Sequence, residues 1–192
     1  MMRFAKLATT QKMQARGILL AATLMTLIVP AAAWANDPAA TLRELLVQYR
    51  CPVVDRLEQM YQAVGASGPR NPFLIIELAA RPQDYVQCVF NSATRMLCEA
   101  SSGFYHGIPG QPRTYRLLPN AIAALGHLGF STDDSAGNFQ TSFDVSNPPD
   151  LNRIADLMLK TLHDGYGARA GVSLLFNEPL APRATSKCIP VS

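Results

Sequence analysis

The sequence lacks the signatures of several functional classes. Only 16% of its 192 residues are charged, and its 3 His and 4 Cys follow no spacing typical of a structural zinc site. It holds no Cys-x-x-Cys pair and no Gly-x-Ser-x-Gly elbow, which argues against a thioredoxin-like redox motif and a hydrolase nucleophile of that type. The 12 Gly and 14 Pro exclude a collagen-like fibre, and 48% hydrophobic residues suffice for one core and exclude a disordered tail.

A basic excess is missing as well, once the N-terminal segment is set apart. The formal net charge is +3, but Arg3, Lys6, Lys12 and Arg16 all lie in a segment without acidic residues. Taking these four from the 17 Lys and Arg leaves 13, against 14 Asp and Glu. A near-neutral remainder lacks the charge that binding to a phosphate backbone needs, so we expect no nucleic-acid partner.

Residues 1–35 have the layout of a secretory signal peptide. The cations up to Arg16 precede an apolar stretch over 18–29, and Ala33-Trp34-Ala35 supplies small residues at both ends of a cleavage tripeptide. A membrane span needs about 20 apolar residues, and no run of that length follows. We therefore predict cleavage after Ala35 and a periplasmic or secreted mature protein without a stable membrane span; the alternative is an uncleaved N-terminal anchor.

All four cysteines lie beyond this segment. An exported chain meets an oxidising environment, where an even number of cysteines predicts paired thiols. Of the three connectivities that four cysteines allow, we predict Cys88 with Cys98 and Cys51 with Cys188. The second pair would join the first helical region to the C-terminal tail.

A predicted β-hairpin decides this pairing. Two short strands flank the loop Ser92-Ala93-Thr94, which closes on Asn91 and Arg95. Counting outward from that closing pair places Cys88 opposite Cys98. If the closing pair is hydrogen-bonded, alternation makes the cysteines a non-hydrogen-bonded pair, whose Cα atoms lie about 4.5 Å apart and within disulfide reach.

The order of the elements predicts a single α+β domain over residues 36–192. Its antiparallel sheet contains a three-strand meander and is packed by N-terminal, middle and C-terminal helices. Apolar residues at three- and four-residue steps predict a helix over 41–64, opened by a capping box at Thr41-x-x-Glu44 and kinked or divided at Pro52. A strand over 73–79, a turn over 81–84 and the two cysteine strands follow.

The second half of the chain continues this pattern. A short helix is expected over 117–128 and a pair of strands over 130–145. A second amphipathic helix begins near Asn147-Pro148-Pro149-Asp150, with Asp156 and Lys160 as a favourable i,i+4 pair. Residues 172–176 are a candidate last strand.

This order resembles the type III secretion chaperone-like fold, including the YbjN and TY-Chap groups. The likeness lies in residues 125–130 (Leu-Gly-His-Leu-Gly-Phe), in Gly137-Asn138-Phe139, and in the helix over 150–167 that closes on Asp-Gly-Tyr-Gly. By topology it covers residues 40–178. The resemblance implies a chaperone-like role in binding a protein or peptide partner, and it carries over no catalytic residue.

The chemistry-bearing residues do not form a catalytic set. Ser101, Ser102, Tyr105 and His106 could supply a nucleophile and a base, but neighbours in sequence rarely adopt that geometry. Asp133 and Asp134 could bind calcium, yet the regular alternation of acidic ligands is missing and the segment is typical of a turn. We expect no catalytic residue, no metal and no cofactor.

The leading hypothesis is a small exported binding module that engages a protein or peptide partner. Candidate partner-binding residues are the aromatic and basic side chains around the Gly- and Pro-rich loop, namely Phe104, Tyr105, Arg113, Tyr115 and Arg116. The run from Arg113 to Arg116 could recognise an anionic group, or could be an edge segment with exposed charges. Two alternatives remain: a periplasmic binder of a small apolar ligand, and a hydrolase that uses the loop from Ser101 to His106.

Overall fold

Helices and strands alternate irregularly along the chain in the computed structural model, which describes residues 38–64, 72–105, 116–179 and 188–191. The elements belong to one unit, Ala35–Ser192. In chain order they are α1 (Pro38–Ala63), β1 (Phe73–Leu78), β2 (Arg81–Ser92), β3 (Arg95–Ala100), α2 (Pro119–His127), β4 (Phe139–Asp144), α3 (Leu151–Lys160), the π-helix η1 (Thr161–Gly165) and β5 (Leu174–Asn177).

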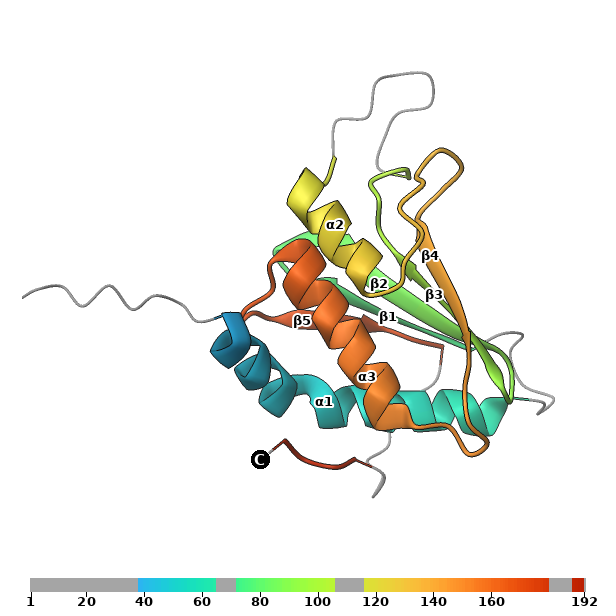
Figure 1. Cartoon of the computed structure of the whole chain (residues 1–192). Helices are drawn as coiled ribbons and strands as arrows, with labels where there is room; N and C mark the ends of the chain where they lie inside the picture. Colours follow the sequence, from blue (N-terminus) through green and yellow to red (C-terminus); the bar gives the residue numbers. More distant parts are fainter. Residues whose placement is uncertain (1–37, 65–71, 106–115, 180–187, 192) are drawn as a thin grey trace, which may run out of the picture. The chain divides into compact units, whose positions relative to one another are not determined.

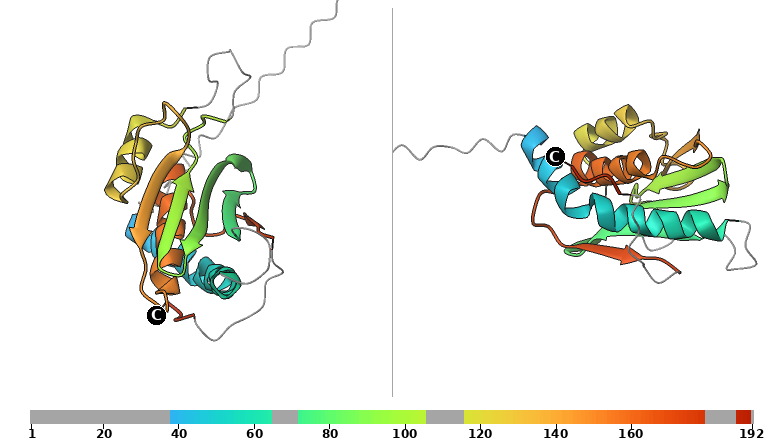
Figure 2. Two further views of the ribbon diagram at one scale, coloured as in Figure 1. Left: turned by 90° about the vertical axis from the view of Figure 1, so that its right-hand side faces the viewer. Right: turned by 90° about the horizontal axis from the view of Figure 1, so that it is seen from below.

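The five strands form one antiparallel sheet in the order β4-β3-β2-β1-β5 (Figure 1). The predicted α+β class and the meander of β1, β2 and β3 are therefore confirmed. Strands β4 and β5 form the two edges, and Figure 2 shows the sheet from two further directions. In the part of the chain that the structure describes, no helix combines the length and the apolar composition needed to cross a membrane.

The β2–β3 hairpin has the predicted register at its cysteines but a different turn. Cys88 lies opposite Cys98, with the Cα atoms 4.1 Å apart. The closing pair is Ser92 with Arg95, so the turn is one residue shorter than predicted. A register shift between Phe90 and Ser92 leaves Asn91 without an opposite residue, and this bulge restores the predicted register beyond it.

One face of the sheet is buried under the helices, because buried and partly exposed side chains alternate along β1, β2 and β3. The buried side chains form one core with those of α1, α3 and η1. The central residues of this core include Leu57, Leu74, Ile76, Met96 and Met158. Helix α2 packs on η1 at Gly165, where a Cβ atom would lie 2.6 Å from Leu125 Cδ2, so glycine permits this close approach.

Helix α1 differs from the prediction at its start. It begins at Pro38, so Thr41 lies inside the helix and the predicted capping box is wrong. The Thr41 hydroxyl instead lies 2.9 Å from His163 Nε2. Of the two outcomes predicted for Pro52, a kink or a division, the division does not occur, because the helix runs without interruption to Ala63. Packing of the α1 side chains against α3 and the sheet outweighs the backbone hydrogen bond that proline cannot make.

Helix α3 begins with Asp150 as its N-cap, whose carboxylate accepts the backbone N–H of Arg153 at 3.1 Å. The expected pair of Asp156 with Lys160 is wrong, because Asp156 binds Arg50 of α1 through both carboxylate oxygens, at 2.7 and 2.6 Å. The bidentate guanidinium contact is the stronger of the two.

Two predictions about the strands and their turns need correction. Residues 130–145 hold one strand, β4, and the polar segment before it is not a strand. The turn predicted over 81–84 lies at Ala79 and Ala80, so β2 begins at Arg81. The candidate last strand over 172–176 is confirmed, because β5 covers Leu174–Asn177 and pairs with β1 at the sheet edge.

Candidate functional site

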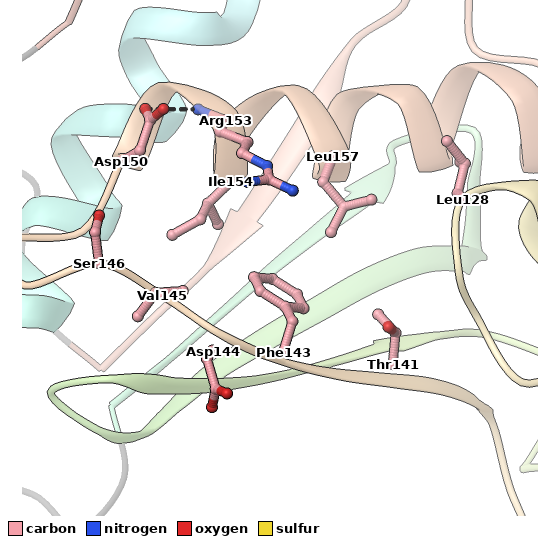
Figure 3. A pocket seen from close by; sticks show the side chains of 10 residues that line it. All are labelled: Leu128, Thr141, Phe143, Asp144, Val145, Ser146, Asp150, Arg153, Ile154 and Leu157. Carbon is pink, nitrogen blue, oxygen red and sulfur yellow. Dashed lines mark hydrogen bonds between the residues drawn. The ribbon is translucent and has the colours of Figure 1, made fainter.

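A groove lies between the edge strand β4 and helix α3 (Figure 3). Its volume is ≈ 320 Å³. We call it the edge groove, and its lining consists of Leu128, Thr141, Phe143, Asp144, Val145, Ser146, Asp150, Arg153, Ile154 and Leu157. The wall on β4 and the wall on α3 both contribute apolar side chains, and the other half of the lining residues are polar or charged.

The backbone of β4 presents hydrogen-bonding groups to this groove. The Val145 N–H donates to Thr94 O on the β3 side at 2.9 Å, whereas Gln140 O accepts the Ser131 N–H on the opposite side at 2.7 Å. In an antiparallel strand these two directions alternate along the chain. The N–H and C=O groups of Ser142 and Asp144 therefore point to the outer edge, and no strand among the described residues pairs with them.

The same alternation sorts the side chains of β4. Phe143 lies opposite Met96, which is buried, so Phe143 faces the helices. Ser142 and Asp144 point to the other face of the sheet and are exposed. Figure 3 shows the Phe143 ring between the strand and Leu157, while the Asp144 carboxylate points away from α3.

A second hollow, which we call the tail pocket, continues from the edge groove along α3. The two share Leu128, Asp150, Arg153 and Leu157. The tail pocket has a volume of ≈ 550 Å³ and is lined by Arg50, His127, Leu128, Asp150, Asn152, Arg153, Asp156, Leu157, Lys160 and Ile189.

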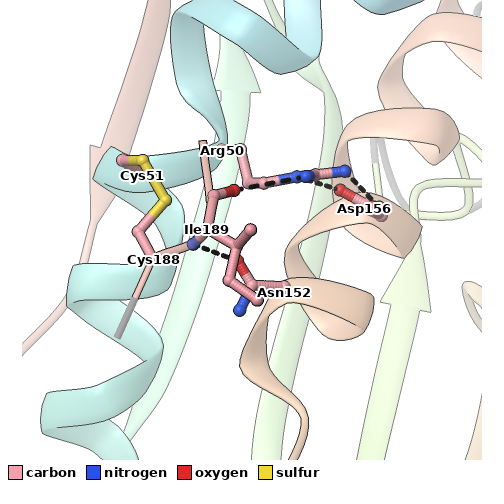
Figure 4. Close-up of a disulfide and its surroundings, with 6 residues drawn as sticks. All are labelled: Arg50, Cys51, Asn152, Asp156, Cys188 and Ile189. Atoms are coloured by element: carbon pink, nitrogen blue, oxygen red, sulfur yellow. Dashed lines mark hydrogen bonds and ion pairs between the residues drawn. A yellow bond between two sulfur atoms is a disulfide. The ribbon is translucent and has the colours of Figure 1, made fainter. Parts of the chain in front are cut away.

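The C-terminal tail contributes Ile189 to the lining of the tail pocket. Figure 4 shows the disulfide and the hydrogen bonds that hold this part of the tail. The Sγ atoms of Cys51 and Cys188 lie 1.99 Å apart, which joins the tail to α1. Ile189 donates its N–H to Asn152 Oδ1 at 2.9 Å, and its carbonyl accepts a hydrogen bond from Arg50 Nη1 at 3.3 Å. Arg50, which belongs to α1, thus contacts both α3 and the tail.

The structure brings the same two cysteine pairs together that the sequence analysis predicted. The Sγ atoms of Cys88 and Cys98 lie 2.07 Å apart, and both side chains are fully buried in the core. Cys51 and Cys188 are only partly buried. The two pairs therefore differ in their access to solvent.

A hydrogen-bonded chain of Thr41, His163 and Asp164 lies outside both hollows. His163 Nε2 lies 2.9 Å from Thr41 Oγ1, and His163 Nδ1 lies 2.6 Å from Asp164 Oδ1. The order of hydroxyl, imidazole and carboxylate matches a nucleophile with its base. However, the His163 side chain is 4% exposed and none of the three residues lines the edge groove or the tail pocket, so the chain links α1 to η1.

The predicted partner-binding residues lie away from the edge groove where they are described. Phe104 and Tyr105 contact each other edge to face, with ring centroids 5.0 Å apart, and Tyr105 is 66% exposed. Arg116 is exposed and lines neither hollow. Arg113 and Tyr115 lie outside the described residues, so their role stays a prediction.

The serines of the proposed hydrolase loop are buried. Ser102 donates its hydroxyl to Gly137 O at 2.8 Å, and Ser101 is fully buried. His106 lies outside the described residues. The described geometry therefore brings neither serine to a base.

The acidic segment has the geometry of a turn. The Ser135 N–H donates to Asp133 Oδ1 at 2.9 Å, and this hydrogen bond lowers the pKa of the Asp133 carboxyl. Among the described residues, no three His, Cys, Asp or Glu side chains gather where they could hold a metal ion.

The fold and the edge groove define a small α+β protein with an open sheet edge over an apolar groove. The chain belongs to the TY-Chap3 family, described as T3SS (YopN, CesT) and YbjN peptide-binding chaperone 3, whose model matches residues 53–179. The resemblance drawn from the sequence is thereby confirmed. No curated protein and no solved structure matches the chain. The matched range contains the whole edge groove, whereas Arg50 and the tail lie outside it.

The residues of the edge groove escaped the sequence analysis. Ile154 and Met158 belong to the main apolar stripe of α3, whereas Leu157 lies beside that stripe and resembles an ordinary surface residue. Phe143 fits the alternating pattern of a strand, so nothing in the sequence marks it as part of a groove. The signal that could have found them is the second apolar face of α3, because an apolar residue outside the main stripe needs another partner.

Proposed function

We propose that this protein binds an extended peptide segment, which adds to the free edge of β4 and places alternate side chains in the edge groove. The observation that carries the proposal is the outward direction of the Ser142 and Asp144 backbone groups beside the apolar walls of Phe143 and Leu157. Strand addition uses main-chain hydrogen bonds for affinity and side-chain pockets for specificity. The edge groove offers both in one place.

The family supports this use of the groove. A module of the peptide-binding chaperone type needs a surface that accepts chains of varied sequence. A strand edge meets that need because every peptide carries the same backbone donors and acceptors. An apolar groove then favours clients with exposed apolar residues, which are the segments that a chaperone protects.

Two substitutions of Ser142 test the contribution of its backbone N–H to peptide binding separately from that of its side chain. In Ser142→Pro the lost N–H points outward, so the ladder with β3 keeps its hydrogen bonds while the added strand loses a donor. The matched control is Ser142→Ala, which removes the hydroxyl and keeps the N–H. A random peptide library displayed on phage and selected on the wild-type protein supplies the ligands.

We expect the selected peptides to bind Ser142→Ala as they bind the wild type, and to bind Ser142→Pro about tenfold more weakly. Amide hydrogen exchange should show that the bound peptide protects Ser142 and Asp144. Equal affinity for all three proteins, or no selected peptide at all, would contradict the proposal.

We further propose that the module acts in the periplasm or outside the cell. The signal-peptide layout of residues 1–35 supports this location, as do the two cysteine pairs at bonding distance. A fusion of residues 1–35 to a reporter that is active only after export tests it. An inactive reporter would place the protein in the cytoplasm.

A further inference from the structure

Two cations on α3 border the two hollows without an acidic partner. Arg153 lines both the edge groove and the tail pocket, and Lys160 lines the tail pocket two turns further along the helix. The acid that sequence spacing would assign to Lys160 is Asp156, and both of its oxygens bind Arg50. None of the carboxylates that the structure describes forms an ion pair with Arg153 or Lys160.

The carboxylates near the edge groove form no ion pair with these cations. The Asp144 side chain points away from α3, to the other face of the sheet (Figure 3). Asp150 caps the helix and accepts the backbone N–H of Arg153, not its guanidinium. His127 also lines the tail pocket. On the α3 wall, Arg153 and Lys160 are therefore the cations that no described carboxylate binds, whereas Asp144 and Asp150 line the edge groove with their own charges.

The spacing along α3 matches the spacing along an added strand. Strand and helix run side by side, with Val145 and Ser146 near Asp150 and with Thr141 near Leu128 (Figure 3). Side chains that point the same way from a β-strand recur about every 6.6 Å. Arg153 and Leu157 are four residues apart, a rise of about 6 Å along the helix axis. One inward side chain of the peptide can face Arg153 while the next faces Leu157.

We propose that the edge groove selects acidic extended segments in which an Asp or Glu lies two residues from a large apolar residue. One acidic side chain faces Arg153, and the apolar side chain two residues away contacts Leu157 and Phe143. A second acidic side chain further along the peptide faces Lys160, where the edge groove continues into the tail pocket. This inference rests on the proposed function, because it names the chemistry of the peptide that the edge groove takes. Charge complementarity of this kind governs the choice of partner and the rate of association more than the final affinity.

The test is a selection of random peptides from a phage library on three proteins with the disulfides intact. These are the wild type, the double variant Arg153→Gln with Lys160→Gln, and the matched control Arg43→Gln, which removes an exposed arginine of α1 outside both hollows. A counter-selection on Leu157→Arg, which blocks the groove, removes peptides that bind elsewhere.

We expect the wild type and Arg43→Gln to enrich peptides with Asp or Glu two residues from an apolar residue, and the double variant to lose this enrichment. A synthetic peptide from the selection should bind the double variant about tenfold more weakly, while its Gln-substituted analogue binds both proteins alike. A higher salt concentration should weaken the binding of the acidic peptide and leave the binding of the Gln-substituted analogue unchanged.

The outcomes separate this inference from the proposed function. Groove-dependent peptides that are neutral or basic would overturn the acidic preference and leave strand addition standing. Acidic enrichment that survives in the double variant would likewise overturn the role of Arg153 and Lys160. If no peptide depends on Leu157, the proposed function fails and this inference fails with it.

Discussion

At the scale of single residues, the hydroxyl of Thr41 is expected to matter for stability. It is the partner of His163 Nε2 in a buried position, and a buried polar atom that loses its partner costs about 1–2 kcal/mol. Thr41→Val should therefore lower the free energy of unfolding by that amount, as measured by chemical denaturation. Thr41→Ser, which keeps the hydroxyl, is the control. A Thr41→Val protein as stable as the wild type would mean that His163 does not depend on this contact.

Tyr85 should make the protein sensitive to alkaline pH. Burial raises the pKa of the Tyr85 hydroxyl. The hydrogen bond that Asn138 donates to it at 2.7 Å lowers the pKa and offsets part of this rise. Because the unfolded tyrosine ionises near pH 10, the unfolded state releases its proton first, and stability falls as the pH rises from there through the folded pKa. Thermal melts of Tyr85→Phe should lose stability less steeply over that range. If stability fell equally steeply with pH in both proteins, the alkaline sensitivity would come from another group.

At the scale of elements, the two disulfides should open in a fixed order. Cys51 and Cys188 are partly exposed, whereas Cys88 and Cys98 are fully buried between β2 and β3, out of reach of a reductant. Mild reduction of the native protein should open the first pair alone and free the tail. Alkylation followed by peptide mapping would show the order. A linkage of Cys51 to Cys88 or Cys98 in the non-reduced protein would contradict both the pairing and the hairpin register.

Local elements could be predicted from the sequence, and the edge groove could not. The register of Cys88 with Cys98 follows from a short hairpin, in which a few residues fix every opposite pair. The partner of β5 is β1, about a hundred residues earlier, and no local pattern encodes that contact. The groove depends on the edge position of β4, which is a property of the whole sheet. Asp156 shows the same limit, because its carboxylate binds Arg50, which is distant in sequence, and does not pair with its helical neighbour Lys160.

At the scale of the whole molecule, the tail is linked to the edge groove through α1 and α3. The bond from Cys51 to Cys188 holds the tail against α1, and Arg50 joins that helix to Asp156 of α3. Helix α3 in turn forms one wall of the edge groove. Loss of the tail contact should therefore alter the position of α3 before it alters the sheet, because the sheet has its own cysteine pair in the core.

The proposed export of the chain leads to a prediction about its fluorescence. The sequence contains 1 Trp, which is Trp34, and it lies in the expected cleavage tripeptide Ala33-Trp34-Ala35. Cleavage after Ala35 removes it, so the mature protein should begin at Asn36 and emit as a tyrosine-only protein. Intact mass and emission spectra of the protein purified from the cell envelope measure both. A full-length chain that carries Ala35→Lys, which spoils the cleavage site, is the control that keeps tryptophan emission. Tryptophan emission from the wild-type envelope protein would mean that the segment is retained as an anchor.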